Sequence, residues 1–340
     1  MSEVGVAGTF ETRAETWAWH LLGFVLPVVT FAGILVGSYW VLSGIILGLV
    51  IYPVLEIFTK DAAPDRSEVR PGGVWDAILL FHTVFTFAIL GCLFWRASVD
   101  GPNWTTWVAA ISTALTSGAS GIITAHELGH RRKHSFLWWV ARLNLLAVLY
   151  LHFTTEHNHG HHRNYATDID PVSAPKERGL WTHIVQAIPR QVVSAWKTHS
   201  ARGRVGFRNP ILHGFIIEAV TILLVWVLFG KWVTLAFLAQ AGVAIILLEY
   251  INYIQHYGLR RGVGEKHSKM HSWESRNILS RWTLLELPLH PAHHLKASDP
   301  IWLLEAHEGS NQLPTGYYGC LWPCLIPPIW KRMMRSRLPE

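Results

Sequence analysis

Long apolar stretches are the feature that most constrains what this chain can fold into. A helix needs about 20 apolar residues to cross the roughly 30 Å hydrocarbon core of a bilayer. Half of the 340 residues are hydrophobic and only 15% are charged, which is unusual for a water-soluble domain. We therefore expect an all-α integral membrane protein with six transmembrane helices. The six stretches lie at roughly 17 to 37, 39 to 58, 75 to 97, 104 to 125, 211 to 229 and 231 to 255.

Basic residues predict how these helices are oriented. The loop after the second stretch contains Lys60, Arg66 and Arg70, whereas the connection "SVDGPN" at 98 to 103 contains no Lys or Arg. Since Lys and Arg are enriched in cytoplasmic loops, both termini and the segment after the fourth stretch are predicted to be cytoplasmic. A seventh apolar stretch, 136 to 153, is interrupted by Arg and Asn. We interpret it as an interfacial or re-entrant helix.

This topology divides the chain into five parts. They are an N-terminal cytoplasmic segment at 1–16, transmembrane helices 1–4 at 17–125, a cytoplasmic and interfacial region at 126–210, transmembrane helices 5–6 at 211–257, and a cytoplasmic helical cap at 258–340. The N-terminus lacks the basic region and cleavage site of a signal peptide, so we expect the first apolar stretch to be retained. The Lys and Arg residues are dispersed between apolar blocks, which predicts membrane lipid and no nucleic acid as a partner.

Histidines cluster at four places that this topology puts on one side of the membrane. Two of the clusters are "HELGH" and "EHNHGHHR", in which histidines recur at i and i+4 and so come close on a helix. A single histidine closes the sixth stretch, and "LHPAHH" has the spacing i, i+3, i+4, with a proline suited to the first turn of a helix. The nine predicted metal ligands are His126, His130, His157, His161, His162, His256, His290, His293 and His294.

Nine imidazoles exceed what one tetrahedral or six-coordinate metal can bind, so the cap is predicted to carry a His-rich site for two metals. Imidazole is compatible with iron, but it does not separate iron from manganese, cobalt or zinc. Ligand histidines usually contact an acceptor that orients the ring. The candidates for that outer role are Glu127, Glu156, Asp168, Asp170 and Glu249. The three cysteines form no C-x-x-C pair, so electrons are expected from another protein.

These motifs, taken in order, resemble one known family. The segments "HELGHRRKH", "EHNHGHHRNYATDIDP", "NYIQHYGL", "SWESRNILSR", "LHPAHH" and "QLPTGYYGCLWPCLIPPIWKRMMRSRL" are similar to those of the integral-membrane alkane 1-monooxygenases. That family is related to membrane fatty-acid desaturases and to xylene monooxygenase. The resemblance extends from roughly residue 50 to the C-terminus.

The resemblance implies an enzyme of the bacterial inner membrane with its metal site on the cytoplasmic side. It implies two non-heme iron ions held by the nine histidines, O2 as a substrate, and electrons from a rubredoxin or ferredoxin-type donor with its NAD(P)H reductase. The implied reaction is hydroxylation of a terminal methyl group of a lipophilic substrate, an alkane, alkylbenzene or fatty acid, to a primary alcohol.

Some positions depart from the family pattern. Arg is usual where His159 stands, an acidic residue is usual where Gln255 stands, and polar residues are usual at the positions of Leu289, Pro291 and Ala292. Benzylic methyl hydroxylation and fatty-acid oxidative decarboxylation or desaturation are therefore alternative reactions on the same scaffold. A b-type cytochrome is a more distant alternative, because it would require His pairs inside the spans rather than at their ends.

Overall fold

The computed structural model describes residues 11–66 and 72–339. In this part of the chain six helical segments are long and apolar enough to cross a membrane, which confirms the predicted number. Arg70 of the topology argument and the first ten residues of the predicted N-terminal segment lie outside the described residues. The six segments are Trp17–Val36, Ser38–Phe58, Gly72–Asp100, Trp104–Gly129, Pro210–Phe229 and Lys231–His256.

Several of these spans are built from more than one helical type. The first joins η1 (Trp17–Phe24) to α1 (Val25–Val36), and the second joins η2 (Ser38–Leu42), α2 (Ser43–Ile46), η3 (Leu47–Ile51) and α3 (Tyr52–Phe58). The fourth joins α5 (Trp104–Thr116), η4 (Ser117–Ile122) and α6 (Ile123–Gly129). The others are single helices: α4 (Gly72–Asp100), α11 (Pro210–Phe229) and α12 (Lys231–His256).

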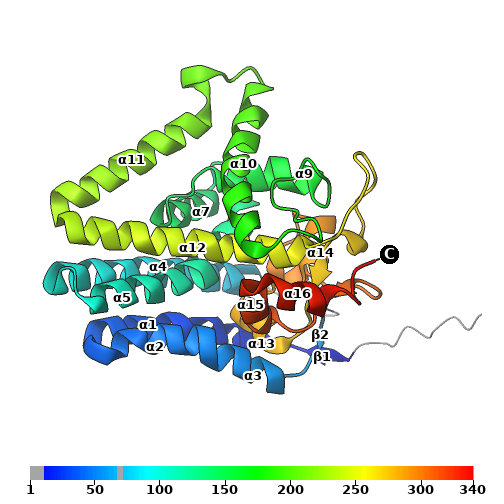
Figure 1. Cartoon of the computed structure of the whole chain (residues 1–340), viewed down its shortest axis with the longest axis horizontal. Coiled ribbons are helices and arrows are strands. Elements are labelled where there is room, and N and C mark those ends of the chain that lie inside the picture. Colours follow the sequence, from blue (N-terminus) through cyan, green and yellow to red (C-terminus); the bar gives the residue numbers. More distant parts are fainter. Residues whose placement is uncertain (1–10, 67–71, 340) are drawn as a thin grey trace, which may run out of the picture.

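Single glycines reverse the chain between adjacent spans. Gly37 has φ 76° and is the one residue between the first two spans, and Gly230 has φ 82° between α11 and α12. Only glycine adopts this left-handed region without a steric penalty, so both hairpins can be this tight. As Figure 1 shows, α4, α5 and α12 then run side by side.

The remaining elements gather mainly at the end of the bundle where the C-terminus lies (Figure 1). Two pairs of short parallel strands join distant segments there, with Thr12 opposite Ala63 and Trp273 opposite Asn311. The strands are β1 (Thr12–Ala14), β2 (Ala63–Asp65), β3 (Trp273–Glu274) and β4 (Asn311–Gln312). The other helices, apart from α7, are α8 (Phe153–Glu156), η5 (His157–His161), α9 (His162–Asn164), α10 (Leu180–Ser200), η6 (Gly206–Arg208), η7 (Lys269–His271), α13 (Ile278–Thr283), α14 (His290–Leu295), η8 (Ile301–Leu303), α15 (Tyr317–Leu325) and α16 (Pro327–Met334).

The seventh apolar stretch is not the single helix that its composition suggests. Helix α7 (Phe136–Ala147) ends after 12 residues, Leu149 takes a positive φ of 54°, and α8 begins at Phe153. Twelve residues span only about 18 Å, which is too short to cross a bilayer. The interfacial or re-entrant placement of this segment stays a prediction.

Side chains from other spans complete the backbone hydrogen bonds of this broken segment. The Nε2 of Gln240, in the middle of α12, donates to the carbonyl oxygen of Ala147 over 2.7 Å. The amide N–H of Leu151 donates to a carboxylate oxygen of Glu218 over 2.6 Å. A buried non-helical backbone requires such partners, because its N–H and C=O groups have no hydrogen bonds within a helix. This explains two polar residues that sit inside otherwise apolar helices.

Candidate metal centre

The structure brings the nine predicted histidines together at the end of the bundle. The α6 helix carries His126, and His130 follows directly after it. The last residue of α12 is His256. The other six come from η5, α9 and α14, which are too short to be stable alone and are held by the surrounding bundle.

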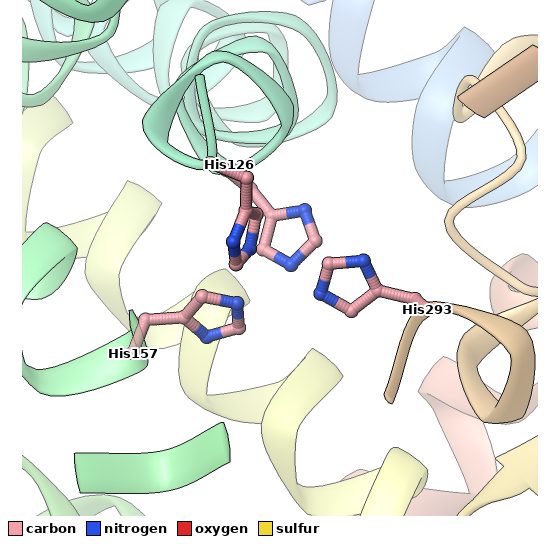
Figure 2. Close-up of side chains that lie close together, drawn as sticks. His126, His157 and His293 are labelled. Carbon is pink, nitrogen blue, oxygen red and sulfur yellow. The ribbon is translucent and has the colours of Figure 1, made fainter. Parts of the chain in front are cut away.

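The imidazoles divide into two groups of four. In each group, one potential ligand atom from every residue lies within 4.8 Å of the others. The first group is His126, His130, His157 and His293, and the second is His161, His256, His290 and His294. Figure 2 shows His126, His157 and His293 of the first group pointing toward one another. Each of the two clusters could hold a metal ion, and the number of metals stays a prediction.

The ninth histidine lies between the groups and closest to the first. The Nε2 atom of His162 is 3.0 Å from the Nε2 of His157 and 3.0 Å from the Nε2 of His293. Its ring also packs against His294 of the second group, with 4.6 Å between ring centroids. We therefore assign five imidazoles to the first group and four to the second.

A widened helical turn explains how residues 157–162 supply three of these rings. The η5 segment is a π-helix, in which the chain turns less per residue than in an α-helix. Residues five apart therefore come closer to the same side, which is the spacing of His157 and His162. Single π-turns within helices are frequent at functional sites.

The α14 helix divides its histidines between the two groups. His290 and His294 are one turn apart and their Nε2 atoms are 2.8 Å apart in the second group. His293 points about 100° around the helix from its neighbour His294. It belongs to the first group. The helix begins at His290 with Pro291 in its first turn, as the sequence predicts.

Burial favours the neutral form of six of these rings. Outside the membrane spans, burial lowers the pKa of His130 to about 4 and holds the pKa of five further histidines well below the usual value. Neutral imidazole is the form that binds a metal. These five are His157, His162, His290, His293 and His294.

The nitrogen atoms fit metal coordination better than they fit hydrogen bonding to one another. The Nε2 atoms that face each other across the second group are 2.8 to 3.2 Å apart. Two ligands at about 2.1 Å from one ion and at right angles to each other are separated by roughly 3.0 Å. The Nε2 atoms of His126 and His130 are buried and have no hydrogen-bond partner among the described residues. A buried polar atom without a partner is costly, and a bound cation would remove that cost.

One of the five proposed outer carboxylates contacts a predicted ligand histidine directly. An Oδ2 atom of Asp170 lies 3.0 Å from Nδ1 of His161 and also accepts a hydrogen bond from Ser173 Oγ. Burial raises the pKa of Asp170, but the His161 ring opposes this and the net pKa is lowered. The neighbouring Asp168 instead lies at the surface, where its side chain is 94% exposed and 3.4 Å from Arg260.

The other three carboxylates are buried but have different partners. Glu127 pairs with Arg131 over 3.3 Å. Glu156 is next to the ligand His157 and close to Ser194. Glu249 accepts hydrogen bonds from Gln191, Tyr150 and Asn252 and contacts no ligand histidine among the described residues.

Two contacts to the centre were not anticipated from the sequence. The carbonyl oxygen of His271 lies 3.3 Å from Nδ1 of His256. The ring of Tyr165 stacks on His294 with 4.0 Å between centroids. The tyrosine follows the second histidine cluster in "HHRNY", which is a local signal, but a backbone carbonyl leaves no signal in a sequence.

An apolar cavity leads from the first histidine group into the bundle. It has a volume of about 100 Å³, and His126 and His157 line one end of it. Leu26, Leu115 and Leu247, from three different spans, also line it. A lipophilic molecule in this cavity would lie with one end against the histidines.

Comparison with known proteins shows which proteins this chain is similar to. The fatty acid desaturase family model matches residues 102–320. Alkane 1-monooxygenase 1 of Pseudomonas aeruginosa is 31% identical over 95% of this chain and 90% of its own length. Alkane 1-monooxygenase of Acinetobacter baylyi is 33% identical over 97% and 86% of the two chains. The hydroxylase component of the xylene/toluene monooxygenase of Pseudomonas putida is 25% identical over 90% and 85%.

Proposed function

The chain belongs to the alkane 1-monooxygenase family of membrane oxidoreductases, within the fatty acid desaturase family, and from this we propose that it hydroxylates a terminal methyl group of a lipophilic substrate. The balanced reaction is R–CH3 + O2 + 2 electrons + 2 H⁺ giving R–CH2OH + H2O. The observation that carries the proposal is the apolar cavity that ends at His126 and His157, the two histidines of the first group that line it.

The proposed cofactor is a pair of non-heme iron ions, one in each histidine group. His126, His130, His157, His162 and His293 would hold the first, and the remaining four histidines would hold the second. The metals would supply O2 activation when bound.

The protein's own residues position the reactants. The cavity walls orient a hydrocarbon by shape, because such a substrate offers no polar group for recognition. The same walls exclude bulk water from the reacting end, which limits side reactions. On the far side of the second group, Asp170 holds the His161 ring in one orientation.

Alanine substitution of one histidine from each group tests the ligand assignment. In His161→Ala and His293→Ala, iron per purified chain should fall and turnover of a panel of alkanes, alkylbenzenes and fatty acids should be lost. The control variant His213→Ala changes an exposed residue and should alter neither iron content nor turnover. Full iron retention in both ligand variants would contradict the assignment. A terminal alkene formed from a fatty acid would instead identify decarboxylation on the same centre.

We further propose that an acidic electron donor of the rubredoxin or ferredoxin type docks beside the histidine-rich segment 157–162. A surface groove of about 950 Å³ is lined there by four cationic residues, Arg163, Arg190, Lys197 and Arg261, and by Glu265 as the one acidic residue. The groove wall also contains Gly160, which is adjacent to the ligand His161. A cationic groove attracts an acidic protein and speeds its encounter at low salt.

Charge reversal tests the docking surface. Arg190→Glu and Lys197→Glu should raise the KM for the donor at low ionic strength by roughly tenfold and leave kcat at saturating donor unchanged. The exposed Arg335, which does not line the groove, provides the control, since Arg335→Glu should have no effect. Equal KM values in all variants would exclude this groove as the docking surface of the donor.

The donor must reach the site from the cytoplasm, so we propose that residues 126–210 and 258–340 lie on the cytoplasmic face of the inner membrane. The three native cysteines are buried, which allows labelling of single introduced cysteines. Lys296→Cys should react with a membrane-impermeant reagent only from the cytoplasmic side, and Asn103→Cys only from the opposite side. Labelling of both from one side would contradict this topology.

A further inference from the structure

Two side-chain amides interrupt the apolar lining of the cavity. Asn252 and Gln255 are three residues apart on α12, so they share one face of the helix, and both line the cavity together with His126 and His157. Asn252 is 7% exposed and Gln255 is 3% exposed, so neither side chain is solvated from outside. Polar groups at such a position decide which ligands the cavity accepts.

The amides lie at the reacting end of the cavity. Helix α12 ends at the ligand His256, and Asn252 is four residues earlier, which is about 6 Å along the helix axis. The cavity lining further from the histidines is apolar, and includes Leu247 and Leu248 on the same helix. A polar group of the substrate would therefore meet the amides next to the carbon that reacts, and not at the far end of its chain.

The orientation of the Asn252 amide is set by a buried carboxylate. Its Nδ2 donates to Glu249 Oε2 over 3.3 Å. Glu249 also receives hydrogen bonds from Gln191 Nε2 over 2.7 Å and from the hydroxyl of Tyr150 over 3.3 Å. A carboxylate surrounded by donors holds the amide nitrogen toward itself. The Oδ1 of Asn252 then has no hydrogen-bond partner among the described residues.

The orientation of the Gln255 amide is set by a tyrosine. The Gln255 Nε2 donates to the hydroxyl of Tyr317 over 3.0 Å, and that hydroxyl donates to the carbonyl oxygen of Leu287 over 3.5 Å. The tyrosine oxygen thus accepts from the glutamine amide, and its own proton points toward the more distant carbonyl of Leu287. The Oε1 of Gln255 is likewise left without a partner among the described residues.

The other hydroxyl groups that line the cavity are already paired. The Tyr250 hydroxyl donates to the carbonyl oxygen of Tyr317. The Tyr318 hydroxyl lies 2.9 Å from Oγ1 of Thr283. Among the described residues, the two amide oxygens are therefore carbonyl-type acceptors without a donor at this end of the cavity.

We propose that Asn252 and Gln255 are specificity-determining residues that select a lipophilic substrate carrying a hydroxyl beside its reacting methyl group. An amide oxygen that faces an apolar cavity without a donor is unfavourable, and a plain hydrocarbon leaves both oxygens without one. A hydroxyl donates to either oxygen and removes that cost. The proposal rests on the proposed methyl hydroxylation, because it concerns the same cavity and the same reacting end.

Matched substrates test the proposal on the iron-loaded enzyme with its donor. Octane, 2-octanol and 2-methoxyoctane have the same chain, but only 2-octanol carries a donor beside the terminal methyl. The products are 1-octanol, octane-1,2-diol and 2-methoxyoctan-1-ol. For the native enzyme, kcat/KM for 2-octanol should exceed that for both other compounds by about tenfold or more, which corresponds to one satisfied buried acceptor.

The variants Asn252→Leu and Gln255→Met remove each acceptor and keep a similar side-chain volume. Each should lower the ratio of kcat/KM for 2-octanol to that for octane by at least about fivefold, and the double variant should abolish the preference. Ile251→Val, in the same cavity wall, should leave the ratio unchanged. If the amide variants do not fold, the native enzyme still provides a test, because 2-octanol should raise its melting temperature more than 2-methoxyoctane does.

The outcomes separate this inference from the proposed function. Turnover of all three compounds with no preference for 2-octanol, or a preference that the amide variants retain, overturns the specificity role and leaves the hydroxylase intact. Native enzyme that contains two irons per chain but oxidises none of the three, nor any alkylbenzene, overturns the proposed function itself.

Discussion

At the scale of single residues, the centre depends on which atoms of each side chain are left for a metal. In His161 the Nε2 atom faces the second group, and the Nδ1 atom is occupied by Asp170. In His256 the backbone carbonyl of His271 plays the same part. The ring orientation is therefore set from outside the centre, before any ligand binds. Asp168, two residues from Asp170, makes no such contribution because its side chain points to solvent.

Asparagine substitutions at these two aspartates should have unequal effects. Asp170→Asn removes the charge that holds the His161 ring and should lower metal affinity by roughly 10–100-fold. Asp168→Asn should leave it unchanged. Metal titration of the two metal-free variants in detergent measures the difference. Equal affinities would mean that Asp170 does not orient the ligand.

At the scale of elements, the π-helix η5 is the part of the centre most sensitive to packing. Gly160 lies within it, and a Cβ at this position would be 2.5 Å from Oε1 of Glu156 and 2.7 Å from Oγ of Ser194. Both neighbours are confined, since Glu156 is buried and Ser194 lies on α10. The absence of a side chain at Gly160 lets α10 lie directly against the segment that presents His157 and His161.

Replacement of Gly160 by alanine should therefore disturb the centre from outside it. We expect Gly160→Ala to destabilise the protein by roughly 1–3 kcal/mol through overpacking and to lower its iron content. Gly91→Ala in α4 is the matched control, because no atom lies within 4 Å of the added Cβ. Melting temperature and iron content measured together check both effects. A Gly160→Ala protein with native values would show that η5 has room to adjust.

At the scale of the whole molecule, a buried ionic network ties the N-terminal segment to the cap. Arg281 is fully buried and donates hydrogen bonds to the carboxylates of both Glu15 and Glu286. Glu286 also pairs with Arg66 over 3.1 Å and contacts His20 over 2.9 Å. The network joins three separated segments of the chain, and the last of them lies directly before α14, which carries three predicted ligand histidines.

This network predicts a pH-dependent contribution to stability. Burial raises the pKa of Glu286, but Arg281 and Arg66 outweigh it and hold the pKa well below its usual range. The stabilisation is therefore present above the usual value of about 4.3 and is lost as the pH falls through the lower folded-state pKa. Glu286→Gln should cost roughly 3–5 kcal/mol near pH 7.

Thermal unfolding as a function of pH checks the sign. The difference in melting temperature between native protein and Glu286→Gln should be largest near neutral pH and should shrink below about pH 4. The exposed Glu305 is the control, and Glu305→Gln should match the native protein throughout. A difference that grows on acidification would contradict the assigned ion pairs.

Composition was sufficient to predict the spans because crossing a bilayer needs only length and apolarity. Residue type was sufficient to predict a metal centre, because few other arrangements use nine histidines at helical spacing. Both predictions depend on local properties of the chain.

Other features depended on contacts between segments far apart in the sequence. The i, i+4 spacing pairs His157 with His161, yet the π-turn and the position of α14 place them in different groups. The apolar run 136 to 153 breaks where Gln240 and Glu218 supply hydrogen bonds from other helices. The cavity forms only when α12 packs against α5 and the cap. The same packing brings the amides of Asn252 and Gln255 to its wall. By itself the sequence determined where the six apolar spans lie and which residues could hold a metal, because apolarity and ligand type are properties of single residues. Only the tertiary structure decided which histidines share a site and what the cavity admits, because those depend on packing between elements.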